Sequence, residues 1–269
     1  VPAREVARLT TLLDQERRLA GNAPTLRRLE AQLAEAVARQ QREAATAAGM
    51  LAAGNVLVGV ATADAQRGAA PPIDPDCAAA LARAGATAGE RTGDGGTRFA
   101  RLPAGPLCAA AASLGHLAFP ADPDGVIRAL PAAVALATGP LPALAIEAAA
   151  PAAGGPGDRV LFLRQYGPSL TAGAFAEVAA SDVLAGIDTA RLRDQVVIVG
   201  ALAGEAPLRT PLGTEAGLPE LLATAIANLL AGEAITRPAG AGLAELLLAV
   251  LLGIGIAVLG PRLPLGTAA

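Results

Sequence analysis

The chain has 269 residues, enough for one or two domains with a sizeable core. All 21 basic residues are arginine, they are scattered along the sequence, and the formal net charge is only −3. With an aromatic content of 2%, the chain lacks both a basic patch and the stacking side chains that nucleic-acid binding uses, so we expect no nucleic-acid partner. The absence of lysine also excludes a Walker A loop and a Schiff-base lysine.

Residues 1–48 predict two amphipathic helices interrupted by Gly-Asn-Ala-Pro. Apolar side chains recur every three or four residues in each helix, as in Val6, Leu9 and Leu13. We expect these helices to pack against a sheet, and a dimer interface is the alternative use. The first residue is Val and not Met, so we expect the chain to be a fragment in which residues 1–48 are the incomplete start of a domain.

Residues 49–238 alternate β-branched runs with helical segments, which predicts a main domain of the α/β class. The expected strands cover residues 55–62, 97–102, 159–167 and 195–202. The expected helices begin near Asp76, cover about 106–114, and end on Gly232 after a start near 215. This order predicts a mixed sheet flanked by helices.

The two cysteines, Cys77 and Cys108, allow one disulfide, and two buried free thiols fit the sequence equally well. Two distant cysteines and a single histidine supply too few ligands for a zinc site. We therefore expect neither a metal nor a cofactor.

One stretch, LGHLAFPADPDGVIRALP at residues 114–131, concentrates the polar residues that could carry chemistry. Pro-Asp-Gly between two runs of strand composition is typical of a hairpin turn, so we expect Asp122, Asp124 and Gly125 to form a structural turn in which the aspartates cap backbone amides. A calcium loop is disfavoured because the later ligands are missing. The remaining hypothesis is ligand contact. The candidate ligand-binding residues are His116, Asp122, Asp124, Arg128 and Tyr166. We predict no catalytic residue.

Residues 241–260 form an apolar run that only Glu245 interrupts. A helix of about 20 residues rises about 30 Å, the thickness of a hydrocarbon core, so the run predicts a C-terminal transmembrane helix. A buried core helix is the alternative. Residues 261–269 are then expected to be a truncated loop.

Several segments follow one another in an order that is similar to that of a known family. They are GHLAFPADPDGVIRALP, LPALAIEAAA, RVLFLRQYGP, FAEVAASDVLAGIDTARLRDQVVIVGALA, TPLG, and AIANLLAG followed by Arg-Pro. From about Asn55 to Gly260, the chain resembles the type-two CHASE domain, the second class of cyclase- and histidine-kinase-associated sensory extracellular domains.

The resemblance implies an extracytoplasmic, periplasmic input domain of a bacterial receptor in the inner membrane. Such a domain relays an unknown small-molecule or protein signal through its membrane helix to an output module, a nucleotide cyclase or a kinase, that this chain does not contain. The expected partners are the membrane, the signal and a second copy in a homodimer. Two rival hypotheses are a membrane-anchored interaction or dimerisation module without an output, and an anchored hydrolase that uses Asp122 or Asp124.

Overall fold

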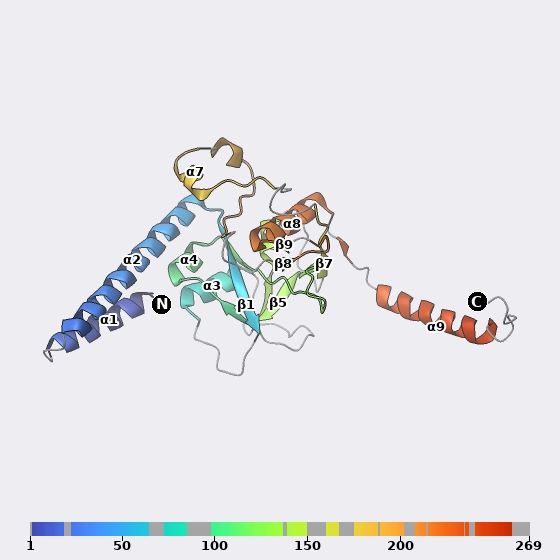
Figure 1. The fold of residues 1–269 in the computed structure, drawn as a ribbon, viewed down its shortest axis with the longest axis horizontal. Helices are drawn as coiled ribbons and strands as arrows, with labels where there is room; N and C mark the ends of the chain where they lie inside the picture. Colours follow the sequence, from blue (N-terminus) through green and yellow to red (C-terminus); the bar gives the residue numbers. More distant parts are fainter. Residues whose placement is uncertain are drawn as a thin grey trace. The chain divides into compact units, whose positions relative to one another are not determined.

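The computed structural model divides the chain into two compact units, Val1–Ala234 and Ile235–Ala269 (Figure 1). The first unit is a mixed α/β domain with small sheets and helices, which confirms that part of the predicted fold class. The structure describes residues 2–18, 23–64, 73–84, 98–136, 139–149, 160–166, 175–187, 189–201, 208–213, 215–233, 235–236 and 240–259.

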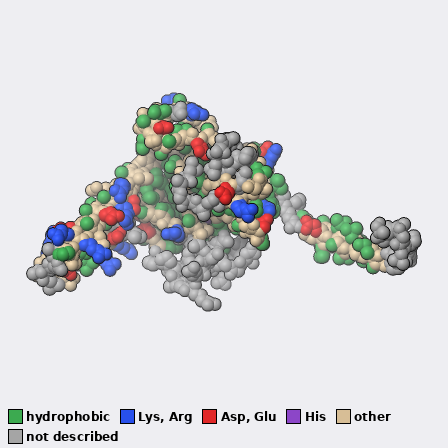
Figure 2. Space-filling view, in the orientation of Figure 1, with side chains coloured by type: hydrophobic (Ala, Val, Ile, Leu, Met, Phe, Trp, Pro, Cys, Tyr) green, Lys and Arg blue, Asp and Glu red, His purple; other side chains and the backbone are tan. Residues whose placement is uncertain are grey.

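The N-terminal helices α1 (Pro2–Arg18) and α2 (Ala23–Ala53) pack against each other along their apolar faces. Leu13 and Ala36 are buried, whereas charged side chains are spread over the visible surface of both helices, between hydrophobic and other atoms (Figure 2). α2 also packs against α4 (Gly105–Ala110). The expected packing against the sheet is thus limited to the last turns of α2, because the two amphipathic faces cover each other first.

The main sheet has five strands in the order β3-β1-β2-β5-β6. The strands are β1 (Leu57–Asp64), β2 (Arg98–Arg101), β3 (Ser113–His116), β5 (Ala133–Leu136) and β6 (Gly139–Pro142). β1 pairs in parallel with β3 and antiparallel with β2, while β5 pairs in parallel with β2 and antiparallel with β6. A bridge between His116 and Ala143 joins the end of β3 to the residue after β6, so the two edges of the sheet meet there.

The sheet carries a hydrophobic core on each face, because successive side chains of a strand point to opposite sides. Val60 of β1 lies in the first core with α3 (Pro75–Arg83), α4 and the last turns of α2. Leu57, three positions earlier in β1 and so on the opposite side, packs against the second core, which α5 (Leu144–Ala148) and α8 (Leu218–Ala231) cover. The helices therefore hold the sheet from both sides, as the predicted α/β class requires.

Among the described strands of the first unit, two short antiparallel pairs lie outside the main sheet. β4 (Ala129–Pro131) pairs with β7 (Val160–Phe162), and β8 (Leu208–Arg209) pairs with β9 (Glu215–Ala216). The hairpin predicted around residues 122–125 is therefore wrong, since β3 and β4 belong to different sheets. β3 is hydrogen-bonded to β1 and β4 to β7, so distant strands take the edges that a local hairpin would have paired.

A helical segment, α7 (Ala180–Leu184) followed by the 3₁₀ helix η1 (Thr189–Leu192), precedes the predicted strand at residues 195–202. That prediction is wrong for residues 195–201, which form no strand, and residue 202 lies outside the described residues. Ile198 packs against the second core, but Val199 is 91% exposed. A strand needs a hydrogen-bonding neighbour, and no strand in the described part of the first unit pairs with this segment.

The second unit contains β10 (Ile235–Thr236) and the helix α9 (Ala241–Leu259). α9 forms where the sequence predicts a transmembrane helix, and its large apolar side chains are exposed, from 49% for Val250 to 72% for Ile256. Among the described residues, no helix combines the length and the hydropathy needed to cross a membrane.

Candidate functional site

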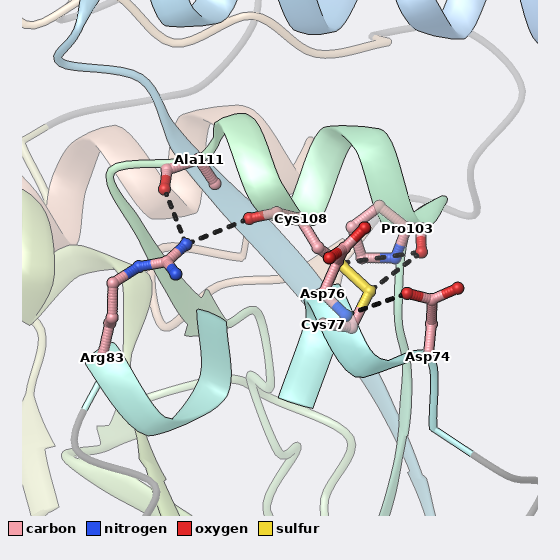
Figure 3. Close-up of a disulfide and its surroundings, with 7 residues drawn as sticks. All are labelled: Asp74, Asp76, Cys77, Arg83, Pro103, Cys108 and Ala111. Atoms are coloured by element: carbon pink, nitrogen blue, oxygen red, sulfur yellow. Dashed lines mark hydrogen bonds between the residues drawn. A yellow bond between two sulfur atoms is a disulfide. The ribbon is translucent and has the colours of Figure 1, made fainter. Parts of the chain in front are cut away.

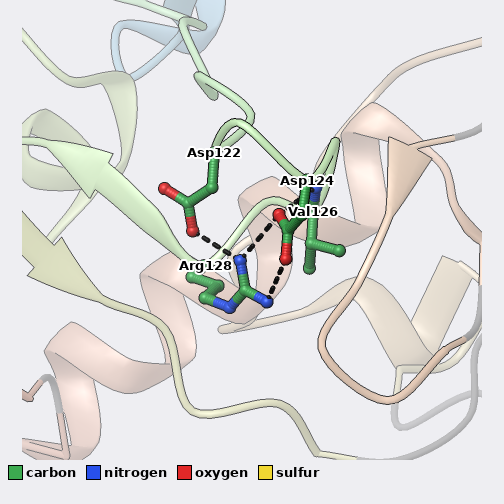
Figure 4. A network of polar contacts seen from close by, with 4 residues as sticks. All are labelled: Asp122, Asp124, Val126 and Arg128. Atoms are coloured by element: carbon green, nitrogen blue, oxygen red, sulfur yellow. Dashed lines mark hydrogen bonds and ion pairs between the residues drawn. The ribbon is translucent and has the colours of Figure 1, made fainter.

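Asp122, Asp124 and Arg128 form a charged cluster on an exposed turn (Figure 4). Two backbone hydrogen bonds close the turn, from Gly125 N–H to Asp122 O (2.8 Å) and from Asp122 N–H to Val126 O (2.9 Å). Gly125 has a φ of 78°, a left-handed conformation that glycine adopts without steric cost. The Asp124 side chain accepts a further bond from Val126 N–H (3.1 Å), so the turn residues hold their own backbone.

The guanidinium of Arg128 binds both aspartates of this turn. It donates to both carboxylate oxygens of Asp124 (2.9 and 2.6 Å) and to one oxygen of Asp122 (2.6 Å). The bidentate hydrogen bonding from Arg128 lowers the pKa of Asp124 to about 2, and the bonds to both aspartates raise the pKa of Arg128. A carboxyl group with such a low pKa is a poor general acid or base at neutral pH, which disfavours the hydrolase hypothesis at Asp124.

His116 lies in the sheet and is 1% exposed, whereas the Asp122–Asp124–Arg128 cluster is exposed. Its Nδ1 atom accepts a hydrogen bond from Ala118 N–H (3.1 Å). The structure therefore does not bring this candidate ligand-binding residue and the charged turn into one site.

Tyr166 belongs to a second polar cluster, in which its hydroxyl donates to Glu233 Oε2 (3.0 Å). Its ring packs edge-on against Phe175, with ring centroids 6.3 Å apart. Arg164 Nη1 binds the other carboxylate oxygen of Glu233 (2.9 Å). Burial, and next the hydrogen bond to Glu233, raise the pKa of Tyr166.

Asn228 is a residue of this second cluster that the sequence interpretation missed. It is 0% exposed, and its side-chain amide pairs with the Arg164 backbone like a neighbouring strand, through Arg164 N–H to Oδ1 (2.7 Å) and Nδ2 to Arg164 O (3.0 Å). A third bond joins Nδ2 to Thr224 O (2.9 Å). The available signal was a lone amide in the apolar run ELLATAIANLL, since a polar side chain on a buried helix face needs partners.

Cys77 of α3 and Cys108 of α4 form a disulfide, which decides between the two alternatives that the sequence left open (Figure 3). Both cysteines are fully buried. Arg83 donates to the carbonyl groups of Cys108 (3.3 Å) and Ala111 (3.4 Å) at the end of α4, and Asp74 caps the start of α3 with a 3.0 Å bond. Disulfides persist in oxidising compartments, which agrees with an extracellular location.

The five candidate ligand-binding residues thus fall into three places: the exposed turn, the interior of the sheet, and the cluster at the end of α8. Tyr166 contacts Glu233, a residue from near the C-terminal end of the first unit. Within the described residues, no group of three or more His, Cys, Asp or Glu side chains could hold a metal ion.

In the comparison with known proteins, one family model matches almost the whole chain. The family model of the CHASE2 domain matches residues 8–260, and no catalytic domain is detected. Neither the search of curated proteins nor the search of solved structures found a match. The matched range includes most of the chain, and the disulfide fits an extracellular location. The chain therefore belongs to the CHASE2 family of extracellular sensory domains.

Proposed function

We propose that this chain is the extracytoplasmic input domain of a bacterial membrane receptor, which passes a signal through α9 to a cytoplasmic nucleotide cyclase or kinase. The observation that carries the proposal is the CHASE2 match over residues 8–260, because domains of this family are sensory and extracytoplasmic. The disulfide supports it, since a buried Cys–Cys bond suits a compartment that is not reducing. The signal itself is a small molecule or a protein that the chain's chemistry does not name.

We further propose that α9 inserts into the bilayer. Its 19 residues, about 28 Å of helix, carry Leu, Ile and Val on every side, and Figure 2 shows little charge along it. A helix that is apolar all round is stable only when protein or lipid covers it. Lipid is the cover that a receptor in the family would use.

Flotation with liposomes of phosphatidylethanolamine and phosphatidylglycerol tests the insertion of α9. The chain should float with the vesicles, and Leu251→Arg should weaken flotation, because an arginine near a helix centre opposes insertion by about 2.5–3.5 kcal/mol. Leu184→Arg is the matched control, since Leu184 is an exposed leucine (89%) of α7 in the first unit. Equal loss of flotation in both variants would show that the vesicles bind a surface other than α9.

Signal relay is tested in the receptor that joins this domain to its output module. Inserting a flexible Gly/Ser linker between Ala239 and Gly240 should uncouple the output from the signal, since a flexible chain transmits no displacement. The same linker inserted after Gly213, an exposed residue between β8 and β9, is the control and should leave signalling intact. Unchanged signalling after the first insertion would rule out relay along the chain into α9.

A further inference from the structure

After β7 ends at Phe162, the chain runs on as residues 163–166, and the buried side-chain amide of Asn228 joins this segment to α8. Leu163 N–H donates to Arg128 O (2.9 Å), which extends the pairing with β4 by one bond. At the next residue, Arg164, the hydrogen-bonding partner is the fully buried side chain of Asn228. Its Oδ1 accepts from Arg164 N–H and its Nδ2 donates to Arg164 O. Because both backbone groups of Arg164 are bound to one side chain, α8 and the chain after β7 are held in one register.

The end of α8 is fixed through the same residue. Gly232 has a φ of 68° and donates its N–H to Leu229 O (3.2 Å), while Glu233 N–H donates to Asn228 O (2.8 Å). These two bonds are the Schellman motif, in which a left-handed glycine closes the last turn of a helix. The backbone of Glu233 therefore has a defined position relative to Asn228.

The Glu233 carboxylate closes a ring back to the chain after β7. One oxygen binds Arg164 Nη1 (2.9 Å) and the other accepts from Tyr166 Oη (3.0 Å). Residues 164 and 166 are two apart, so their side chains leave an extended chain on the same side and reach one carboxylate together. We call Arg164, Tyr166, Asn228 and Glu233 the exit ring.

The contacts within the exit ring differ in how readily they open. Asn228 is buried at 0% exposure, so releasing it would leave polar groups unpaired in the core. The ion pair of Glu233 is exposed, with 59% of the Arg164 side chain and 36% of the Glu233 side chain accessible, and such pairs are weak. The ring thus combines a permanent anchor with a contact that a small change in free energy can release.

We infer that the exit ring is a latch that holds the resting state of the domain by fixing where the chain leaves α8 toward the second unit, which starts at Ile235. The inference rests on the proposed signal relay. Release of Glu233 from Arg164 and Tyr166 lets the two Schellman bonds open and frees Gly232 and Glu233, while the side chain of Asn228 keeps the rest of α8 in place. A signal that favours the released state shifts the population of the two states and so changes the output.

The test compares Glu233→Gln combined with Tyr166→Phe against Glu30→Gln as a matched control. Glu30 pairs with Arg17 at the same N–O distance of 2.9 Å, with similarly exposed side chains, but joins α1 to α2. Amide hydrogen exchange on the whole chain should accelerate about two- to fivefold at Gly232 and Glu233 in the double variant, the equilibrium equivalent of an exposed ion pair. Exchange in the middle of α8 should stay unchanged, and Glu30→Gln should leave Gly232 and Glu233 unaffected.

The same variants in the full receptor separate the latch from the relay. The double variant should shift the output without signal, whereas Glu30→Gln should not. Unchanged exchange at Gly232 and Glu233, faster exchange throughout the domain, or faster exchange with an unchanged resting output would each overturn the latch. In the last case the Gly/Ser insertion between Ala239 and Gly240 tests the relay separately. If that insertion abolishes the response to the signal, the receptor relays its signal along the chain although the exit ring is not a latch.

Discussion

Replacing Asn228 with alanine should be the most damaging single loss of hydrogen bonding in the first unit among the contacts described above. The change leaves Arg164 N–H and Arg164 O without their partner. A buried backbone group left unpaired costs about 1–3 kcal/mol, and these two lie in a partly buried place, so we expect a loss of about 2–4 kcal/mol in the free energy of unfolding. Losing the bond to Thr224 O should add little to this cost, because that carbonyl lies within α8, where it also accepts a backbone hydrogen bond of the helix.

Urea unfolding followed by circular dichroism measures this loss. With a denaturant dependence of about 2–3 kcal/mol per molar urea, the midpoint should fall by about 1–2 M. Asn55→Ala is the matched control, because Asn55 is exposed just before β1, and its effect should stay within about 0.5 kcal/mol. An equal, small effect of the two substitutions would refute the view that Asn228 holds the chain after β7.

Asn228→Asp sharpens the same test. The introduced carboxylate keeps an acceptor for Arg164 N–H but loses both donor bonds of Nδ2 and places a charge in the core. Burial raises the pKa of the introduced carboxyl above its unfolded value, so its deficit should be largest at pH 7 and should shrink as the pH falls to about 4 and the group binds a proton. A deficit that is the same at both pH values would show that the position is accessible to water.

Three further predictions concern other parts of the first unit. Reduction of the Cys77–Cys108 disulfide, whose cysteines are 31 residues apart, should lower the free energy of unfolding by about 3–4 kcal/mol, measured by urea unfolding with and without reductant; an unchanged midpoint in the fully reduced protein would contradict this. Gly115→Ala should destabilise by about 1–3 kcal/mol, because an added Cβ would overlap the backbone of α5. Gly49→Ala, in α2 with open space around it, should instead stabilise by about 0.5–1 kcal/mol, and opposite signs of the two thermal shifts are the result to look for. The pKa of Asp124 is lowered to about 2 in the folded state, below its usual 3.8, so its contribution to stability is present above about pH 4 and is lost as the pH falls toward 2; Asp124→Asn should flatten the acid limb of the urea midpoint in that window, and an identical limb would show that the pair with Arg128 does not persist in solution.

Local patterns determined several elements correctly. The spacing of apolar residues predicts α1 and α2, and the run ending in Gly232 predicts α8 with its left-handed glycine at the end. The β-branched run from residue 55 predicts β1. In each case the signal and the structure lie in the same ten to thirty residues, because helix periodicity, capping and strand composition are local properties. The order of motifs also identified the CHASE2 family, which the comparison confirms.

Partner choice was decided only by the tertiary structure. Residues on both sides of the Asp122–Gly125 turn have strand composition, yet β3 pairs with β1 and β4 with β7 instead of with each other. Residues 195–201 have the same composition and form no strand. Composition makes a segment able to donate and accept strand hydrogen bonds, but which neighbour satisfies them depends on how the whole chain packs.

The contacts that define the candidate sites follow the same division. The sequence shows that Asp122, Asp124 and Arg128 are close enough along the chain to meet in one turn, and they do so within residues 122–128. The Cys77–Cys108 bond and the contact between Asn228 and Arg164 join residues that are 31 and 64 positions apart. Sequence spacing cannot select such pairs, because they form only after two hydrophobic cores have brought α3 onto α4 and α8 onto the chain after β7.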